Sequence, residues 1–116
     1  MTISKHSILS LWAENLKKKN LSSLLDLYHQ DAILIPTFSP SPLHHDGGIK
    51  NYFDNKFLPV SPEVIECKQE QVATLNTIEC HTGLYVFKTE SGEQEARFTF
   101  IYKEGKILHH HSSVVG

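Results

Sequence analysis

The sequence has little of several features that would by themselves indicate a protein class. It contains two cysteines, Cys67 and Cys80, whose spacing matches no metal-binding pattern. Its 11 basic and 13 acidic residues give a formal net charge of -2, and the lysines are scattered rather than gathered in a stripe. No apolar run approaches the ~20 residues that a membrane-spanning helix needs. We therefore expect that the protein binds neither nucleic acid nor a membrane.

The N-terminal apolar patch, Ile8 to Ala13, also lacks the features of a secretory signal. No small-residue cleavage site follows it, and the lysines at 17–19 come after the patch instead of before it. A cytoplasmic protein with both cysteines reduced is the expectation, because a reducing compartment does not favour disulfides.

The 116 residues, of which 40% are hydrophobic, are enough for one core, so we expect a single domain spanning residues 1–116. Apolar residues at helical spacing predict three helices in the first half, with Ser4, Asn20 and Asp46 as N-caps. The apolar faces of these helices are formed by Ile8, Leu11, Trp12 and Leu16, by Leu21, Leu24, Leu25 and Tyr28, and by Ile49, Tyr52, Phe53 and Phe57.

Alternating apolar residues predict five strands, and a loop at 37–43 follows the first of them. The expected strands are Asp31–Pro36, Val64–Leu75, Ile78–Lys88, Glu95–Tyr102 and Lys106–Val114. Helices followed by an antiparallel meander indicate an α+β fold.

The last two strands form a hairpin whose register can be derived. If Glu104-Gly105 is a two-residue turn, Lys103 pairs with Lys106, Thr99 lies opposite His110, and Arg97 lies opposite Ser112. Side chains alternate across a strand, so one face then carries Arg97, Thr99, Ile101, Leu108, His110 and Ser112. A bulge at Gly105 would exchange the faces of one strand relative to the other.

Five segments, in this order and spacing, carry a resemblance to a known family: Asp31–Ser39, Ile49–Phe53, Gly83–Phe87, Ala96–Tyr102 and His109–Ser113. Together they resemble the nuclear transport factor 2-like superfamily, and most closely the association domain of calcium/calmodulin-dependent protein kinase II and its stand-alone bacterial relatives. The resemblance implies a cone-shaped, cystatin-like roll in which a curved, mostly antiparallel sheet wraps round N-terminal helices. It also implies self-association.

In that association domain, arginines line a deep pocket that can bind small carboxylates. The resemblance places Arg97 at one of these arginines, whereas Ser112 and Tyr85 stand at or near the other two. Arg97 also alternates with aromatics on its strand, and a guanidinium presents a planar fork to an oxyanion. We therefore expect a pocket for a small carboxylate or carbonyl compound, without a cofactor. Its expected ligand-binding residues are Arg97, His110, Ser112, Thr99, Tyr85 and Trp12.

The three consecutive histidines suggest a zinc site as one hypothesis, because His109 and His111 project from the same face of a strand. A zinc site needs a third ligand, and nothing in the sequence fixes His44, His45 or Asp46 nearby. A structural or interface role for His109 and His111 is the preferred interpretation, with no metal bound.

Two alternatives to a ligand-binding, self-associating domain stay open. An isomerase, dehydratase or cyclase would use His110 as the acid-base group, and it would need a large pocket with a buried acid beside that histidine. A purely structural oligomerisation module would instead have its pocket sealed by Trp12, Phe38 and Phe53.

The derived register also predicts a dimer. It places Phe98, Phe100 and Tyr102 on the face opposite the pocket, where they would form an exposed apolar patch. Isologous packing of two sheets would bury that patch, with His109 and His111 beside it.

Overall fold

The computed structural model describes residues 8–45 and 47–115. Its first helix, α1 (Ile8–Lys17), buries Leu9, Trp12 and Leu16. The predicted apolar face is therefore rotated slightly, because Leu9 faces the core whereas Leu11 is 38% exposed. The predicted N-caps Ser4 and Asp46 lie outside the described residues.

The second helix, α2 (Leu21–Asp26), begins as predicted. The side chain of Asn20 accepts a hydrogen bond from the Ser23 backbone N–H, which confirms its role as N-cap. The prediction that Tyr28 belongs to this helix is wrong, because the helix ends at Asp26 and Tyr28 opens strand β1 (Tyr28–Ile35). The backbone N–H of Ile107 donates to the Leu27 carbonyl over 2.7 Å, so pairing with the last strand begins there.

A compact helical segment follows strand β2 (Leu43–His44). Helix α3 (Gly48–Tyr52) continues into the π-turn η1 (Phe53–Phe57) and the 3-10 turn η2 (Leu58–Val60). The aromatic side chains of this segment are buried, as its apolar spacing predicts.

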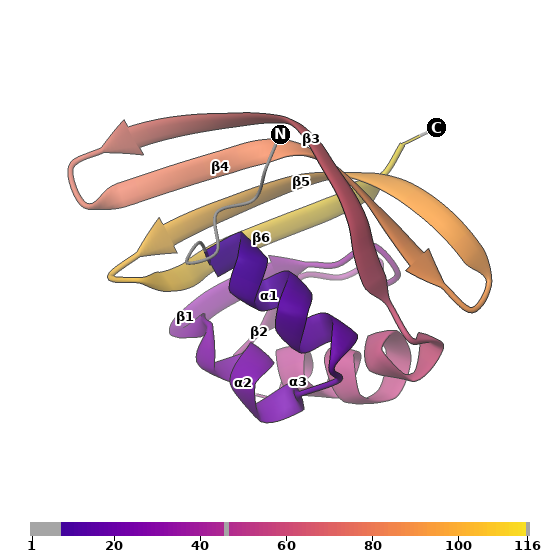
Figure 1. Cartoon of the computed structure of the whole chain (residues 1–116). Coiled ribbons are helices and arrows are strands. Elements are labelled where there is room, and N and C mark those ends of the chain that lie inside the picture. The colour runs from indigo at the N-terminus through magenta and orange to yellow at the C-terminus, as the bar shows by residue number, and fades with distance from the viewer. Residues whose placement is uncertain (1–7, 46, 116) are drawn as a thin grey trace.

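The four remaining strands are β3 (Glu63–Leu75), β4 (Ile78–Thr89), β5 (Gly92–Lys103) and β6 (Lys106–Val114). They form an antiparallel meander, and the six-stranded sheet has the order β2-β1-β6-β5-β4-β3 with β1 parallel to β6. Figure 1 shows the described helices on one side of the curved sheet. We call the side that packs on the helices the inner face and the other side the outer face. The predicted α+β cone is confirmed.

The hairpin turn forms where the sequence predicts it, but the register beyond it differs. Glu104 and Gly105 both have positive φ, and Lys103 pairs with Lys106. The pairing then shifts between Ile101 and Tyr102, and Leu108 is left without a partner across the ladder. From this bulge onward, every pair differs by one residue from the derived register.

This one-residue shift moves side chains between the faces. Phe100 pairs with His110 and Phe98 pairs with Ser112, so these four side chains share the inner face. The expected exposed patch of Phe98, Phe100 and Tyr102 is therefore wrong, because all three are buried in the core.

None of the described helices is long and apolar enough to cross a bilayer.

Gly83 gives a test of how closely β3 packs on β4. A Cβ added there would lie 3.0 Å from the Glu70 Cα and 3.1 Å from the Lys68 carbonyl oxygen, and backbone atoms cannot move aside easily. We expect Gly83→Ala to lower the free energy of unfolding by about 1–3 kcal/mol, measured by urea denaturation. Lys88→Ala, an exposed change on the same strand, is the control. Equal stability of the two variants would contradict this packing.

Candidate functional site

His110 and Ser112 are the buried polar side chains of β6 that face the inside of the cone, with exposures of 2% and 4%. The ring of His110 stacks on Phe100 with a centroid separation of 3.9 Å. Trp12 from α1 meets the same imidazole edge-on at 5.2 Å. An imidazole in these apolar surroundings must have its polar atoms satisfied by hydrogen bonds.

The first of these hydrogen bonds reaches His110 from the helix. The indole N–H of Trp12 donates to the hydroxyl of Tyr28 over 3.1 Å. The Tyr28 oxygen lies 2.9 Å from Nδ1 of His110. Because indole can only donate, the Tyr28 oxygen accepts from Trp12 and its own proton is free to go to His110.

The second half of the network leads from His110 towards the loop at 37–42. The Tyr85 hydroxyl lies 3.3 Å from Nε2 of His110 and donates to the Ser112 hydroxyl over 2.7 Å. The Ser112 hydroxyl in turn contacts the Thr37 hydroxyl at 2.5 Å. Since Tyr85 uses its proton on Ser112, Nε2–H of His110 donates to Tyr85. Ser112 accepts from Tyr85 and has Thr37 as its other described partner, so we assign the Ser112 proton to the Thr37 hydroxyl.

The charge state of His110 follows from its burial. Desolvation lowers the pKa of His110 to about 3, with smaller contributions from His109 and His111. The ring is therefore neutral near pH 7, with its proton on Nε2, and every hydrogen bond from Trp12 to Thr37 runs in one direction. Burial likewise raises the pKa of Tyr28 and of Tyr85, so both hydroxyls stay protonated.

The structure brings four of the six expected site residues together: His110, Ser112, Tyr85 and Trp12. Sequence reasoning missed Tyr28 and Thr37, which complete the network. The helical spacing of Tyr28 to Leu24 predicts a helix there, and the prolines after Thr37 predict a loop. The available signal for Thr37 was its position directly after the first strand. A hydroxyl at that end of the sheet can reach the polar side chains of the last strand, His110 and Ser112.

The placement of Arg97 and Thr99 inside the cone is wrong. Because of the bulge at Leu108, Arg97 pairs with Ser113 and is exposed on the outer face. Thr99 pairs with His111 on that face, where its hydroxyl donates to Thr82 over 3.3 Å. Among the described residues, no lysine or arginine is buried.

The interior of the cone is nearly filled. The cavity beside His110 and Ser112 measures about 10 Å³, which is at most the space for one water molecule. Its lining includes Trp12, Phe53 and Phe57, so aromatic rings occupy the space that a ligand would need. Phe38 covers this region from outside, in ring contact with Phe57 and Phe87.

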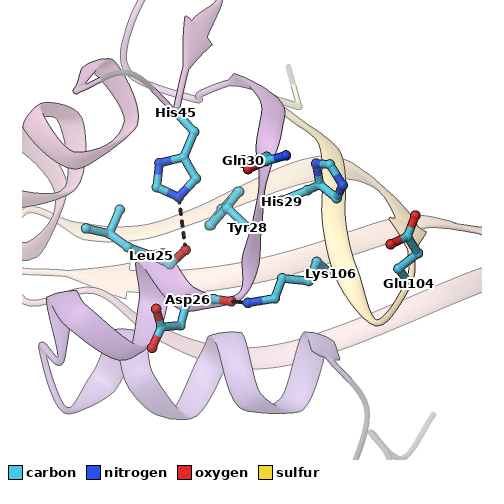
Figure 2. Close-up of a pocket in the computed structure, with 8 residues that line it drawn as sticks. All are labelled: Leu25, Asp26, Tyr28, His29, Gln30, His45, Glu104 and Lys106. Carbon is cyan, nitrogen blue, oxygen red and sulfur yellow. Dashed lines mark hydrogen bonds between the residues drawn. The ribbon is translucent and has the colours of Figure 1, made fainter.

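A larger hollow, of about 480 Å³, lies outside the cone (Figure 2). Lys106 and His45, which line it, are held by the backbone carbonyls of Asp26 and Leu25 respectively. Its lining mixes acidic and basic side chains. It is an open groove between α2, β1 and the β5–β6 turn, and of the network residues in the cone only Tyr28 lines it.

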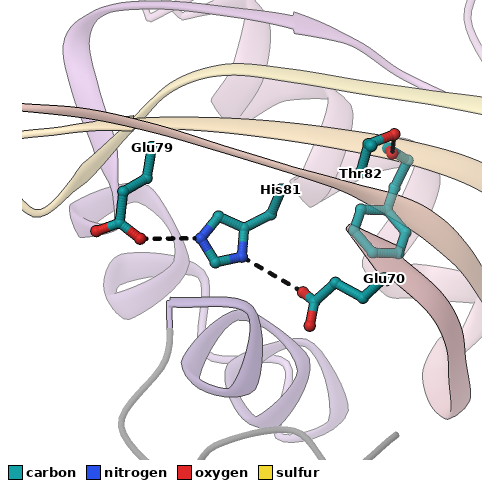
Figure 3. Close-up of polar contacts among 5 residues, drawn as sticks. Glu70, Glu79, His81 and Thr82 are labelled. Atoms are coloured by element: carbon teal, nitrogen blue, oxygen red, sulfur yellow. Dashed lines mark hydrogen bonds and ion pairs between the residues drawn. The ribbon is translucent and has the colours of Figure 1, made fainter. Parts of the chain in front are cut away.

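A second polar cluster lies on the long β3–β4 hairpin (Figure 3). His81 contacts Glu70 through Nδ1 at 3.4 Å and Glu79 through Nε2 at 3.1 Å. The two carboxylates approach opposite edges of the ring, so they do not converge on one point with it. In the part of the chain that the structure describes, no three His, Cys, Asp or Glu side chains are arranged to hold a metal ion.

Next to this cluster, Tyr102 has its hydroxyl buried without a hydrogen-bond partner among the described residues. Its ring packs against His81 with a centroid separation of 4.8 Å. Burial and the nearby Glu70 and Glu79 raise the pKa of Tyr102, so the hydroxyl stays protonated.

Comparison with solved structures gives close matches to the fold. A crystal structure from Xanthomonas campestris, of a protein proposed to be a calcium/calmodulin-dependent protein kinase II association domain, has 30% identity and a TM-score of 0.84. The match covers 93% of this chain and 83% of that chain. No protein-family model and no curated protein sequence matches the chain.

Two further structures share the fold at low identity. A proposed dehydratase of the NTF2-like family from Streptomyces avermitilis is 12% identical, with a TM-score of 0.82 over 94% of this chain and 91% of that one. A proposed polyketide cyclase from Sinorhizobium meliloti is 11% identical, with a TM-score of 0.69 over 90% of this chain and 92% of that one.

The fold and these matches define a cone-shaped α+β domain of the nuclear transport factor 2-like class. The match to the Xanthomonas campestris protein, at 30% identity over most of both chains, is high enough to show that the two proteins belong to one family. This chain belongs to the nuclear transport factor 2-like superfamily, among the proteins related to the kinase II association domain, which confirms the resemblance carried by its sequence segments.

Two of the buried tyrosines, Tyr85 and Tyr102, allow a matched test of the network. Tyr85→Phe leaves Ser112 and His110 without their partner, so we expect a loss of about 1–3 kcal/mol in the free energy of unfolding. Tyr102→Phe removes a hydroxyl that has no described partner, so we expect unchanged or higher stability. Thermal and urea unfolding of both variants, monitored by circular dichroism, provide the comparison. Equal losses would show that the Tyr85 hydroxyl adds nothing.

Proposed function

We propose that this chain is a self-associating domain that pairs with a second copy of itself through the outer face of its sheet. The observation that carries the proposal is that the described helices all lie on the inner face, which leaves the outer face uncovered within the described part of the chain. The family relationship to an association domain supports it.

The outer face has the apolar composition that a sheet-to-sheet interface needs. Its apolar side chains come from strands β1, β4 and β5, and all are half-buried in the single chain: Ile33, Ile35, Leu84, Val86 and Ile101. A face of this kind is self-complementary, so two copies related by a two-fold axis would bury it on both sides. This replaces the aromatic patch that the derived register predicted.

Titratable groups lie on the same face. His109 on β6 pairs with Ile101 on one side and with Ile33 on the other. His44 on β2 pairs with Ile33 from the far side of β1, and His111 lies two residues after His109 on the same face of β6. Burial and the neighbouring His111 lower the pKa of His109, so its neutral form is favoured. Two copies would therefore bring neutral His109 side chains together above pH 7.

We place this function in the cytoplasm. Cys67 and Cys80 are both free, with Cys67 buried and Cys80 half-buried, which fits a reducing compartment.

A second candidate function is binding of a small molecule inside the cone. The polar row of His110, Tyr85 and Ser112 favours it, because hydrogen-bonding groups in an aromatic pocket are what orients a small ligand. Trp12 would form the apolar wall. With Arg97 on the outer face, the argument for a carboxylate is lost, and a carbonyl compound is the ligand class that we retain. The filled interior ranks this candidate below self-association.

Enzymatic use of His110 has less support. Its pKa of about 3 makes it a weak base, and its partners in the network are hydroxyl groups rather than a carboxylate. General acid-base catalysis works best with a pKa near the working pH.

Self-association is tested by measuring mass with light scattering at micromolar concentrations. We expect a mass of at least twice the 13.2 kDa of the single chain. Ile101→Glu would bury a charge at the interface, so we expect at least roughly tenfold weaker association. Leu11→Glu, at a 38% exposed position of α1 on the other side of the sheet, is the matched control and should associate normally. A parent protein that is monomeric at every concentration would refute the proposal.

Association should also weaken in acid. Pairing would bury His109 further than the single chain does and so lower its pKa beyond the already lowered value, which means that the histidine takes up protons on dissociation. Pairing is therefore favoured above the ordinary histidine pKa of about 6.5 and is lost as the pH falls through the lowered pKa. Sedimentation at about pH 5 and about pH 8 should show more dissociation at the lower pH. A His109→Gln, His111→Gln double variant should lose most of this difference. Equal pH dependence of parent and variant would place the histidines away from the interface.

A further inference from the structure

The loop at 37–42, between β1 and β2, separates the interior of the cone from a second cavity. Thr37 lines the small interior cavity, and the next residue, Phe38, lines an outer cavity of about 270 Å³ together with Lys56, Val60 and Gln94. Phe38 is 44% exposed, yet its ring contacts the buried rings of Phe57 and Phe87. Two consecutive residues of the loop thus stand between the two spaces.

Few contacts hold this loop in place. The Thr37 hydroxyl binds Ser112, a hydrogen bond joins the Phe38 backbone to the Tyr52 hydroxyl, and the Phe38 ring packs on its two neighbours. A large apolar ring that is almost half exposed contributes less to stability than a buried one. Displacing Phe38 should therefore cost less than displacing one of the fully buried rings of the cone wall.

The direction of the hydrogen bonds sets what would replace the loop. Each group from Trp12 through Tyr28, His110 and Tyr85 donates to the next, and Ser112 donates to Thr37. If Thr37 moves away, the Ser112 O–H is a buried donor without an acceptor. A molecule that enters must supply an acceptor oxygen to it.

We propose that Thr37 and Phe38 form a movable cover over the cone, and that the ligand admitted beneath it is a small neutral molecule with a carbonyl oxygen that accepts from Ser112. This inference rests on the second candidate function, binding inside the cone. The carbonyl oxygen takes the place of the Thr37 hydroxyl, and the apolar body of the ligand takes the place of the Phe38 ring and extends into the outer cavity.

The same surroundings exclude charged ligands. A carboxylate would lie near Ser112 without a cation, because no described lysine or arginine is buried, and an unpaired buried charge is costly. An ammonium would direct its N–H groups at a row of hydroxyls that already donates outward. Selectivity for the neutral compound therefore follows from the polarity of the network.

The test uses three compounds that have the same six-membered carbon ring and differ in the polar group: cyclohexanone, cyclohexanecarboxylate and cyclohexylammonium. Their dissociation constants are measured by ligand-observed NMR on the full chain. In Phe38→Ala the cover no longer restricts entry, so we expect cyclohexanone to bind at least roughly tenfold more tightly than to the parent, and the two ions to gain little. Adding Ser112→Ala to this variant should remove the gain. Tyr52→Phe, which frees the loop while keeping the Phe38 ring, should act in the same direction.

Ile65→Ala is the matched control, since Ile65 is 43% exposed but lies on β3. It should leave all three dissociation constants unchanged. If the parent binds cyclohexanone through Ser112 and neither Phe38→Ala nor Tyr52→Phe tightens binding, the cone site stands and the cover is wrong. If no variant binds cyclohexanone, or if the carboxylate binds as tightly, the proposed ligand class fails too. The light-scattering mass of the same samples reports on self-association separately.

Discussion

The neutral imidazole of His110 is the interaction on which the interior of this domain depends. It accepts from Tyr28 on one side and donates to Tyr85 on the other, and so links α1, β1, β4 and β6 through a single ring. A proton added to Nδ1 would turn the acceptor that faces Tyr28 into a donor. Because the hydrogen bonds around the ring all run in one direction, that change would set two donors against each other and break the hydrogen bond between Tyr28 and His110. The pKa of about 3 keeps this from happening near neutral pH.

The network explains why the core of the cone can contain polar groups without charge. The imidazole of His110 and the hydroxyl groups of the network are all hydrogen-bonded, so the usual cost of burying such groups is offset. Filling the remaining space with Trp12, Phe53 and Phe57 leaves about 10 Å³ beside them. The larger cavities lie outside this filled interior, one of them beside Phe38 of the loop at 37–42.

Local signals in the sequence predicted the elements well, and failed where tertiary pairing decides. The Asn20 cap and the Glu104-Gly105 turn each depend on a few neighbouring residues, and both formed as predicted. Tyr28 has helical spacing to Leu24, but pairing with β6 draws it into a strand. The bulge at Leu108 has no glycine or proline to signal it, since it arises from fitting β6 between β1 and β5. Four of the six expected site residues lie together nonetheless, because Tyr85 and Trp12 did not depend on the hairpin register.

The bulge also places Arg97 and His110 on opposite faces of the sheet, whereas a register without the bulge would put both on the same face. Without it, Arg97 would share a face with His110, and the cone would contain a cation able to hold an anion. With it, the aromatic residues and His110 face inward, whereas Arg97, His109 and His111 face outward. His109 and His111 therefore lie on the face proposed for pairing, whereas the imidazole that burial keeps neutral lies in the core. One unpaired residue in β6 thus decides which histidines a partner copy would meet and which histidine stays inside the cone.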